Sequence, residues 1–220
     1  MRHNKIITSF LIFILLSVSN GFGIGADVCE QQKSVLDPIN EDEARLNRLM
    51  PPDKVLEIVG VSPGMTVAEI GAGKGRYIVH LAVRVGKAGK VFAEDIDASA
   101  LEFLENRCKR WDLENVEIIL GEETDPKLPR GEVDIIFVVS SYHHFDDPVS
   151  LLRNARSALK PEGKLAVVEW IPWNRNDREG TPPAKLEEEM KAAGYRLERL
   201  ESLDLAKKLN IYIFRVENLE

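Results

Sequence analysis

Three glycines at alternate positions follow a short apolar run, and a helical pattern begins directly after them. The run is Thr66–Ile70, the glycines are Gly71, Gly73 and Gly75, and apolar residues recur at helical spacing from Tyr77. Glycine has no Cβ, so a loop of this kind lets the backbone approach a ligand closely. The free N–H groups at the start of the next helix point toward the same ligand. The stretch therefore predicts a strand, a ligand-binding loop and a helix.

The spacing of these glycines excludes two common nucleotide-binding loops. The dinucleotide fingerprint G-x-G-x-x-G needs its third glycine where this chain has Arg76. A P-loop needs glycine where Ala68 stands, and Ser or Thr where Gly75 follows Lys74. The pattern that remains is Glu-x-Gly-x-Gly-x-Gly.

That pattern, formed by Glu69 and the three glycines, resembles the first motif of class I S-adenosylmethionine (SAM) dependent methyltransferases. The resemblance extends over about residues 50–216. It implies SAM as the cofactor, bound beside Glu69, Gly71, Gly73 and Gly75. It also implies a sheet of seven strands in which the last strand is antiparallel.

An acidic side chain ends the second predicted strand, Lys90–Asp95. In nucleotide-binding βαβ units, a carboxylate about twenty residues after the glycine loop accepts hydrogen bonds from ribose hydroxyls. Asp95 suits this role, while Asp97 suits the N-cap of the next helix. The resemblance likewise makes Asp95 the ribose ligand. It also makes Glu122, after the predicted strand Val116–Leu120, the contact for the adenine amino group.

The continuous apolar run Val133–Val139 indicates a strand buried on both faces, as in a parallel sheet covered by helices. Its carboxyl end is where open α/β sheets place their ligand crevice. The segment there resembles one that lines the donor and acceptor sites in bacterial small-molecule methyltransferases. We therefore expect Ser140 beside the cofactor and Tyr142, His143 and His144 as catalytic residues. The alternative for each histidine is simple polarity at a helix entry.

Strands that alternate with helices predict an α/β fold with a single doubly wound, mostly parallel sheet. We expect a helix over Val149–Leu159, a turn over 160–163 and a strand over Lys164–Glu169. The last two strands are predicted at Tyr195–Leu200 and Asn210–Val216. The proline-bearing loop 170–183 follows the strand Lys164–Glu169 and predicts a lid or substrate wall, with Trp170 and Trp173 as aromatic surface; a mobile connection is the alternative.

The N-terminus has the pattern of a secretory signal peptide. Arg2 and Lys5 precede the uncharged run Ile6–Val18, and small residues follow up to Ala26. We predict a signal peptide over 1–25, a linker with a helical extension over 26–50, and the methyltransferase domain over 51–220. The protein is then exported to the periplasm or medium. An uncleaved membrane anchor through residues 6–26 is the alternative.

The acidic balance bears on the partners of the chain. The net charge is −7, and removal of Arg2 and Lys5 with the signal peptide makes it −9. This charge disfavours nucleic acids and anionic membranes as partners. With no separate substrate domain, we expect a small-molecule acceptor. Cys29 and Cys108 could form a disulfide, although Cys108 also fits simple packing in a helix; no Cys/His spacing predicts a metal site.

The predicted chemistry is in-line transfer of a methyl group from a sulfonium. The protein must mainly align donor and acceptor, and a general base is needed only where the acceptor loses a proton. A binding protein without turnover is the second hypothesis, because SAM is made in the cytosol and an exported enzyme would lack it. A nicotinamide-dependent oxidoreductase is disfavoured by Arg76. The sequence defines neither the acceptor nor the oligomeric state.

Overall fold

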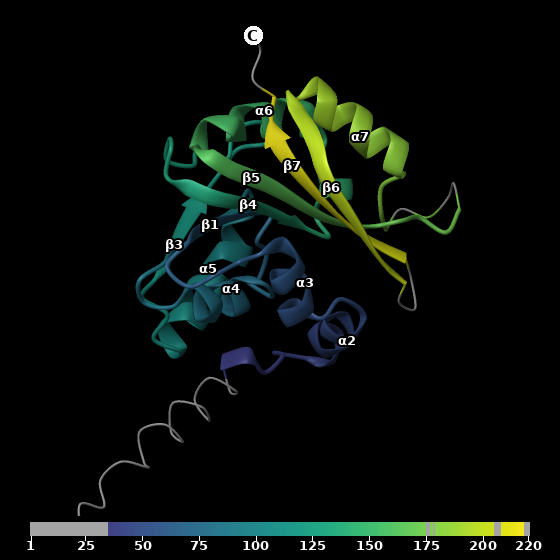
Figure 1. Cartoon of the computed structure of the whole chain (residues 1–220). Coiled ribbons are helices and arrows are strands. Elements are labelled where there is room, and N and C mark those ends of the chain that lie inside the picture. The colour runs from purple at the N-terminus through teal and green to yellow at the C-terminus, as the bar shows by residue number, and fades with distance from the viewer. Residues whose placement is uncertain (1–34, 175–176, 178, 205–207, 218–220) are drawn as a thin grey trace, which may run out of the picture. The chain divides into compact units, whose positions relative to one another are not determined.

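The described strands form one seven-stranded sheet in a computed structural model of the chain (Figure 1), in the order β3-β2-β1-β4-β5-β7-β6. The structure describes residues 35–174, 177, 179–204 and 208–217, and those from Val35 on belong to one compact unit. The predicted signal peptide and Cys29 lie outside the described residues. No helix in the described ranges is both long and apolar enough to span a bilayer.

The strands are β1 (Thr66–Ile70), β2 (Lys90–Asp95), β3 (Val116–Leu120), β4 (Val133–Val139), β5 (Leu159–Trp170), β6 (Tyr195–Asp204) and β7 (Lys208–Val216). The α-helices are α2 (Glu41–Leu49), α3 (Pro52–Val59), α4 (Ile78–Val85), α5 (Ala98–Arg110), α6 (Pro148–Ala155) and α7 (Pro183–Ala192). Two short 3₁₀ helices are η1 (Tyr142–His144) and η2 (Arg156–Ala158).

The sheet is parallel from β3 through β5, and β7 runs antiparallel to both of its neighbours. In the centre, Val67 of β1 lies opposite Val91 of β2 and Ile135 of β4. The predicted doubly wound, mostly parallel sheet with an antiparallel last strand is therefore confirmed. Parallel pairing brings the carboxyl ends of β1, β2, β4 and β5 to the same edge.

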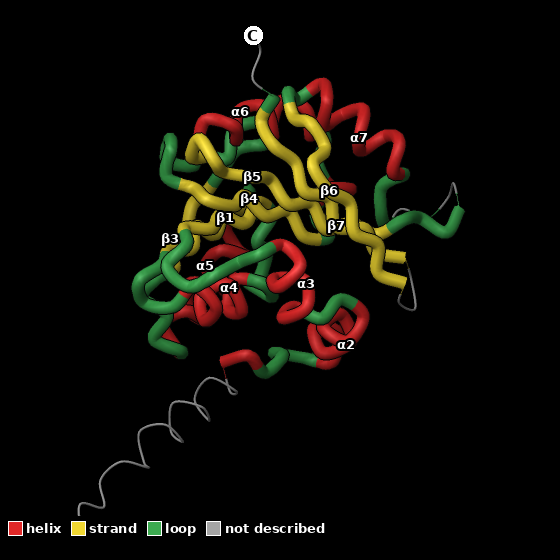
Figure 2. Tube along the Cα trace, in the orientation of Figure 1, coloured by secondary structure: helices red, strands yellow, loops and turns green. Residues whose placement is uncertain are grey.

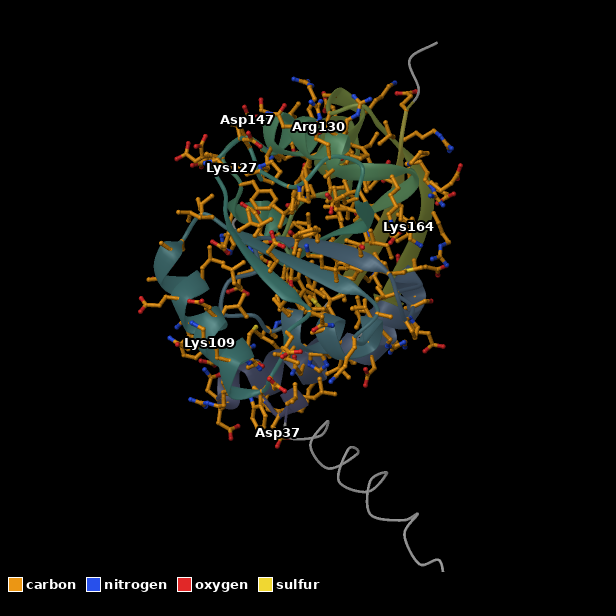
Figure 3. The ribbon with its side chains drawn as sticks, turned by 90° about the vertical axis from the view of Figure 1, so that its left-hand side faces the viewer. Asp37, Lys109, Lys127, Arg130, Asp147 and Lys164 are labelled. Atoms are coloured by element: carbon orange, nitrogen blue, oxygen red, sulfur yellow. The ribbon has the colours of Figure 1, made fainter. Side chains whose placement is uncertain are left out.

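Helices cover both faces of the sheet (Figure 2). Alternate residues of a strand point to opposite faces, so Val67 packs in one buried cluster and Ala68 in the other. The first cluster includes apolar residues of α3, α4 and α5, and the second includes those of α6 and α7. Charged side chains such as Lys109, Lys127 and Asp147 lie at the periphery (Figure 3). Burial on both faces explains why the central strands are almost purely apolar.

The segment before β5 differs from the prediction. The expected helix Val149–Leu159 ends earlier, at Ala155, and continues only as η2; Leu159 is already the first residue of β5. The predicted turn over 160–163 is an irregular part of this strand, where the pairing with β4 shifts register. Pro161 has no N–H to donate to the ladder, which favours such an irregularity. Arg215 of β7 donates to the carbonyls of Glu162 and Gly163 and holds the segment in place.

Helix α2 joins the domain through a buried ion pair. Asn40 caps the helix by accepting a hydrogen bond from the Glu43 N–H at 2.8 Å. The Glu43 carboxylate then accepts from the Arg107 guanidinium of α5, with N–O distances of 2.7 and 3.2 Å. The side chains of Glu43 and Arg107 are only 7% and 3% exposed. Arg107 also donates to the carbonyl of Lys74 in the glycine loop at 3.3 Å.

This ion pair generates a stability prediction. Glu43→Ala leaves the Arg107 guanidinium buried without its counter-charge, which costs on the order of 3–5 kcal/mol. Urea denaturation of the purified protein measures this loss of unfolding free energy.

The matched control is the exposed pair Glu105–Lys109 on α5, whose side chains are 52% and 65% exposed. Glu105→Ala should change the unfolding free energy by less than about 1 kcal/mol. Similar effects of the two substitutions would contradict the assigned role of the buried pair.

Candidate functional site

The glycine loop is tied to the end of β2 by three backbone donors. Gly71 and Ala72 both donate to the carbonyl of Glu94 at 2.9 Å. Gly73 donates to Oδ2 of Asp95 at 2.7 Å. The loop after β1 and the acidic end of β2 are thus one rigid unit at the carboxyl edge of the sheet, where open α/β folds bind ligands.

The three glycines serve different purposes. Gly71, Gly73 and Gly75 all have positive φ, at 78°, 53° and 83°. A Cβ on Gly73 would meet no atom within 4 Å, whereas a Cβ on Gly75 would lie 2.3 Å from Leu104 of α5. Gly73 therefore keeps open space beside the loop, and Gly75 permits close packing of α5. A Cβ on Gly71 would lie 2.7 Å from Ser141, so this glycine lets η1 approach the loop.

A first pocket of about 300 Å³ lies over the glycine loop. Its wall includes Glu69, Gly73 and Ser140 at the strand ends, and residues such as Asn40 and Asp42 near the start of α2. The pocket is therefore closed on one side by the segment that the Glu43–Arg107 pair fastens.

Glu69 is the buried carboxyl of this pocket. It is 3% exposed, and its Oε2 has no hydrogen-bond partner in the structure. Burial raises the pKa of Glu69 to about 8; the nearby Arg76 opposes this shift, and Asp95 adds to it. A buried polar atom without a partner that faces a pocket suits a polar ligand.

A second pocket lies on the other side of Gly71, lined by Asp95, Glu122 and His144 among others. Oδ1 of Asp95 accepts from the Asp97 N–H at 2.9 Å while Oδ2 holds Gly73. A carboxylate oxygen has two lone pairs, so each oxygen can accept one more donor. Glu122 also forms an ion pair with Lys127 at 2.6 Å.

These features fit SAM along the strand ends. The unpartnered Oε2 of Glu69 and the open space at Gly73 suit the polar methionine part in the first pocket. Asp95 stands between the pockets with acceptor capacity for a ribose diol. Glu122 in the second pocket stands where the adenine amino group is expected.

The third nucleotide-loop position is filled by a side chain that packs against α2. Arg76 hydrogen-bonds Asn47 at 3.4 Å and lies 4.6 Å from the Tyr77 ring centroid. The third glycine of the dinucleotide fingerprint is therefore absent at this helix start, where such folds bind a pyrophosphate.

The segment after β4 begins with strained backbone. Ser140 has φ 53°, in the left-handed region that is uncommon for residues other than glycine, and it lines the first pocket. Such strain is stored most often at functional sites. Ser141 follows, and its hydroxyl donates to the carbonyl of Ile70 at 3.2 Å, which fixes η1 beside β1.

The three predicted catalytic residues of η1 point in different directions. Tyr142 is 2% exposed, packs in the cluster that includes α6 and α7, and donates its hydroxyl to Glu189 of α7 at 2.8 Å. Burial and the adjacent Glu189 raise the pKa of Tyr142, so its hydroxyl stays protonated. The catalytic role expected of Tyr142 does not agree with this orientation.

His143 pairs with a carboxylate that the sequence analysis did not select. Its Nδ1 lies 3.1 and 3.0 Å from Oε1 and Oε2 of Glu169 at the end of β5. His144, in contrast, is exposed and lines the second pocket. The partial burial of its ring and, next, the neighbouring His143 lower the pKa of His144. The two imidazole rings are 4.1 Å apart.

The two tryptophans expected as aromatic surface differ in exposure. Trp170 is 6% exposed and belongs to the hydrophobic cluster that includes α3, α4 and α5, so it offers no surface to an acceptor. Trp173 is 72% exposed on the loop that follows.

Among the described residues, no group of three or more His, Cys, Asp or Glu is placed to hold a metal ion. Cys108 is buried and not bridged to another described residue.

The raised pKa of Glu69 generates a prediction on stability. The folded-state value of about 8 lies above the ordinary 4.5, so the stabilisation is complete at low pH and is lost as pH rises toward 8. One such group lowers the unfolding free energy by about 1.4 kcal/mol per pH unit within this range. Glu69→Gln should therefore flatten the decline measured by urea denaturation between pH 5 and pH 8. Glu94, whose pKa burial also raises to about 8, leaves part of the slope in place. An unchanged slope would show that Glu69 ionises normally.

Comparisons with known proteins agree with this geometry. A family model described as a methyltransferase domain matches residues 67–163. The crystal structure of a SAM-dependent methyltransferase from Aquifex aeolicus is 29% identical with a TM-score of 0.70, and the match covers 85% of this chain and 98% of that one.

Two relatives with assigned activities match this chain over less than half of their own length. Nocamycin O-methyltransferase of Saccharothrix syringae is 29% identical over 120 residues, covering 54% of this chain and 42% of that protein. The ubiquinone/menaquinone C-methyltransferase UbiE of Shewanella sp. (strain ANA-3) is 29% identical over 116 residues, covering 52% and 46%. The chain thus spans less than half the length of these two relatives. Together with the seven-stranded fold, the matches show that the chain carries a class I SAM-dependent methyltransferase domain.

Proposed function

We propose that this protein transfers a methyl group from SAM to a small-molecule acceptor. The observation that carries the proposal is the bond from Gly73 N–H to Asp95, which joins the glycine loop of the first pocket to a carboxylate of the second pocket. The relatives methylate different atoms by their names, one an oxygen and one a carbon. The acceptor atom is therefore argued from the site of this chain alone.

SAM supplies an activated methyl group on a positively charged sulfur. The residues of the chain bind and orient it: Asp95 accepts from the ribose hydroxyls, and the glycine loop leaves room for the methionine part. The segment at the start of α2 closes one side of the first pocket and so helps to exclude water there. Alignment and exclusion of water are the main requirements of such a transfer.

The first prediction concerns the ribose carboxylate. A hydrogen bond to a charged group contributes roughly 1.5–3 kcal/mol, and about 1.4 kcal/mol corresponds to one decade of affinity. Asp95→Ala should therefore weaken SAM binding about tenfold to a hundredfold in isothermal titration calorimetry. Gly73→Val should abolish binding, because its side chain fills the open space beside the loop. A β-branched residue is strained at the φ of 53°, so circular dichroism on the same sample checks that the protein remains folded.

Asp97→Ala is the matched control. Asp97 caps α5 by accepting from the N–H groups of Ser99 and Ala100, so its loss costs about 1 kcal/mol of stability and leaves SAM affinity unchanged. Equal affinities of wild type and Asp95→Ala would move the ribose site elsewhere. Tighter binding of NAD than of SAM in the same titration would contradict the proposal as a whole.

The alternative function is that of an exported protein that binds SAM without turnover, in a compartment where SAM is scarce. It rests on the N-terminal pattern of Arg2, Lys5 and the uncharged run Ile6–Val18. Mass spectrometry of the natively purified protein separates the two functions. Retained S-adenosylhomocysteine supports turnover, and retained SAM alone supports binding.

We further propose that the chain is exported and that residues 1–25 are removed. N-terminal sequencing of the protein from the cell envelope or medium should then begin near Ala26. Intact Met1 on protein recovered from the cytosol would contradict export, and intact Met1 on membrane-bound protein would support the anchor.

A further inference from the structure

Glu169 is a buried carboxylate at the carboxyl end of β5. Its side chain is 1% exposed. Oε1 accepts from the N–H of Trp170 at 2.7 Å, and Oε2 accepts from the N–H of His143 at 3.2 Å. The Nδ1 atom of His143 lies about equally far from both oxygens, at 3.1 and 3.0 Å.

This arrangement determines which ring nitrogen of His143 carries hydrogen. Two backbone donors already point at the two oxygens, so a proton on the carboxyl would face an N–H. The carboxylate is an acceptor only, and a lone pair on Nδ1 would face its negative charge. Nδ1 therefore holds a hydrogen and donates it, and Nε2 is the nitrogen left to accept or release a proton.

The position of His143 relates this nitrogen to the pockets. Ser140, before it in the chain, lines the first pocket, and His144, after it, lines the second. Ser141 holds the segment against the end of β1, beside Gly71. His143 thus stands on the short segment between residues of the two pockets, and its side chain is 7% exposed.

The other ionisable groups near this pair lie on several elements. His144 of η1 is the closest, at 4.1 Å between ring centroids. Glu179, on the loop after β5, acts electrostatically on His144, and Glu189 of α7 bonds Tyr142. Among these neighbours, only Glu169 contacts the His143 ring through a hydrogen bond in the described structure.

We propose that Glu169 is a positioning residue that holds His143 with Nδ1 protonated, so that Nε2 removes the proton of a hydroxyl acceptor. The inference rests on the proposed methyl transfer and gives it a class of acceptor. A thioether has no proton to lose and a neutral amine attacks without losing one first, whereas a hydroxyl needs a base near neutral pH.

The proposed transfer moves one proton and one methyl group. The hydroxyl proton moves to Nε2 while the acceptor oxygen bonds to the methyl carbon. The bond from that carbon to the sulfonium sulfur breaks, and its electron pair remains on sulfur. His143 becomes an imidazolium beside the Glu169 carboxylate and returns the proton to water after the products leave.

The test uses the full-length protein labelled with ¹⁵N-histidine. Long-range ¹H–¹⁵N correlation spectra distinguish a protonated Nδ1 from a protonated Nε2, and the loss of a signal in His143→Gln assigns the ring. We expect the neutral ring to carry its hydrogen on Nδ1 in the wild type and to lose this preference in Glu169→Gln. A hydrogen on Nε2 in the wild type, or an unchanged ring in Glu169→Gln, would overturn the proposal.

Reactivity of Nε2 separates a catalytic position from a merely structural pair. Diethyl pyrocarbonate modifies an accessible imidazole lone pair, and peptide mass spectrometry reports the rate at each histidine. His143 should react at Nε2 in the wild type and several-fold more slowly in Glu169→Gln, because Nε2 then carries the ring hydrogen in much of the population and has no lone pair to react. No reaction at His143 while His144 reacts would mean that Nε2 is enclosed, and would overturn the catalytic assignment.

Glu189→Gln is the matched control, since it changes the carboxylate that contacts the neighbouring residue Tyr142. It should leave both the spectrum and the reactivity of His143 unchanged. SAM affinity is measured by calorimetry on the same samples. Absent SAM binding with the expected tautomer would refute the proposed function, whereas intact SAM binding with the wrong tautomer would refute only the role of Glu169.

Discussion

The hydrogen bond from the Gly73 N–H to Asp95 is the interaction on which the site depends. It joins the loop after β1 to the end of β2 at 2.7 Å and adds to the two bonds from Gly71 and Ala72 to the Glu94 carbonyl. The bond uses one lone pair of Oδ2, and Oδ1 of the same carboxylate accepts from the Asp97 N–H, so both oxygens are held in place. Asp97 in turn caps α5, the helix that carries Arg107. Loop, strand end and helix start are thus positioned by one acidic segment.

Buried acids are concentrated where the parallel strands end. Glu69, Glu94 and Glu169 are each no more than 3% exposed, at the ends of β1, β2 and β5. The strand interiors are apolar, so these carboxyls lie at the boundary between the core and the pockets. Burial of an acid is costly unless it is neutralised or hydrogen-bonded. The structure uses both solutions: burial raises the pKa of Glu69 and Glu94 to about 8, while Glu169 is surrounded by three donors.

The sequence predicted what depends on local patterns. Apolar runs that alternate with helical spacing predicted an α/β fold with a mostly parallel sheet, and the family resemblance implied seven strands. The glycine loop and Asp95, both selected from the sequence, lie together at the strand ends. Directions of side chains within η1 were not predictable, because a single 3₁₀ turn sends Tyr142 into the core and His143 toward β5. Glu169 was missed, although a charge at the end of an apolar run was the same signal that identified Asp95. Its role depends on a contact with η1, which no local pattern contains.

A crystal structure of the complex with S-adenosylhomocysteine tests the central claim most directly. The account predicts the ribose hydroxyls on Asp95, the amino-acid part over Gly73 beside Glu69, and the adenine near Glu122. It further predicts that the sulfur lies on the side of the site toward Nε2 of His143. A ligand bound away from the carboxyl ends of β1 and β2, or a ribose without contact to Asp95, would contradict the account.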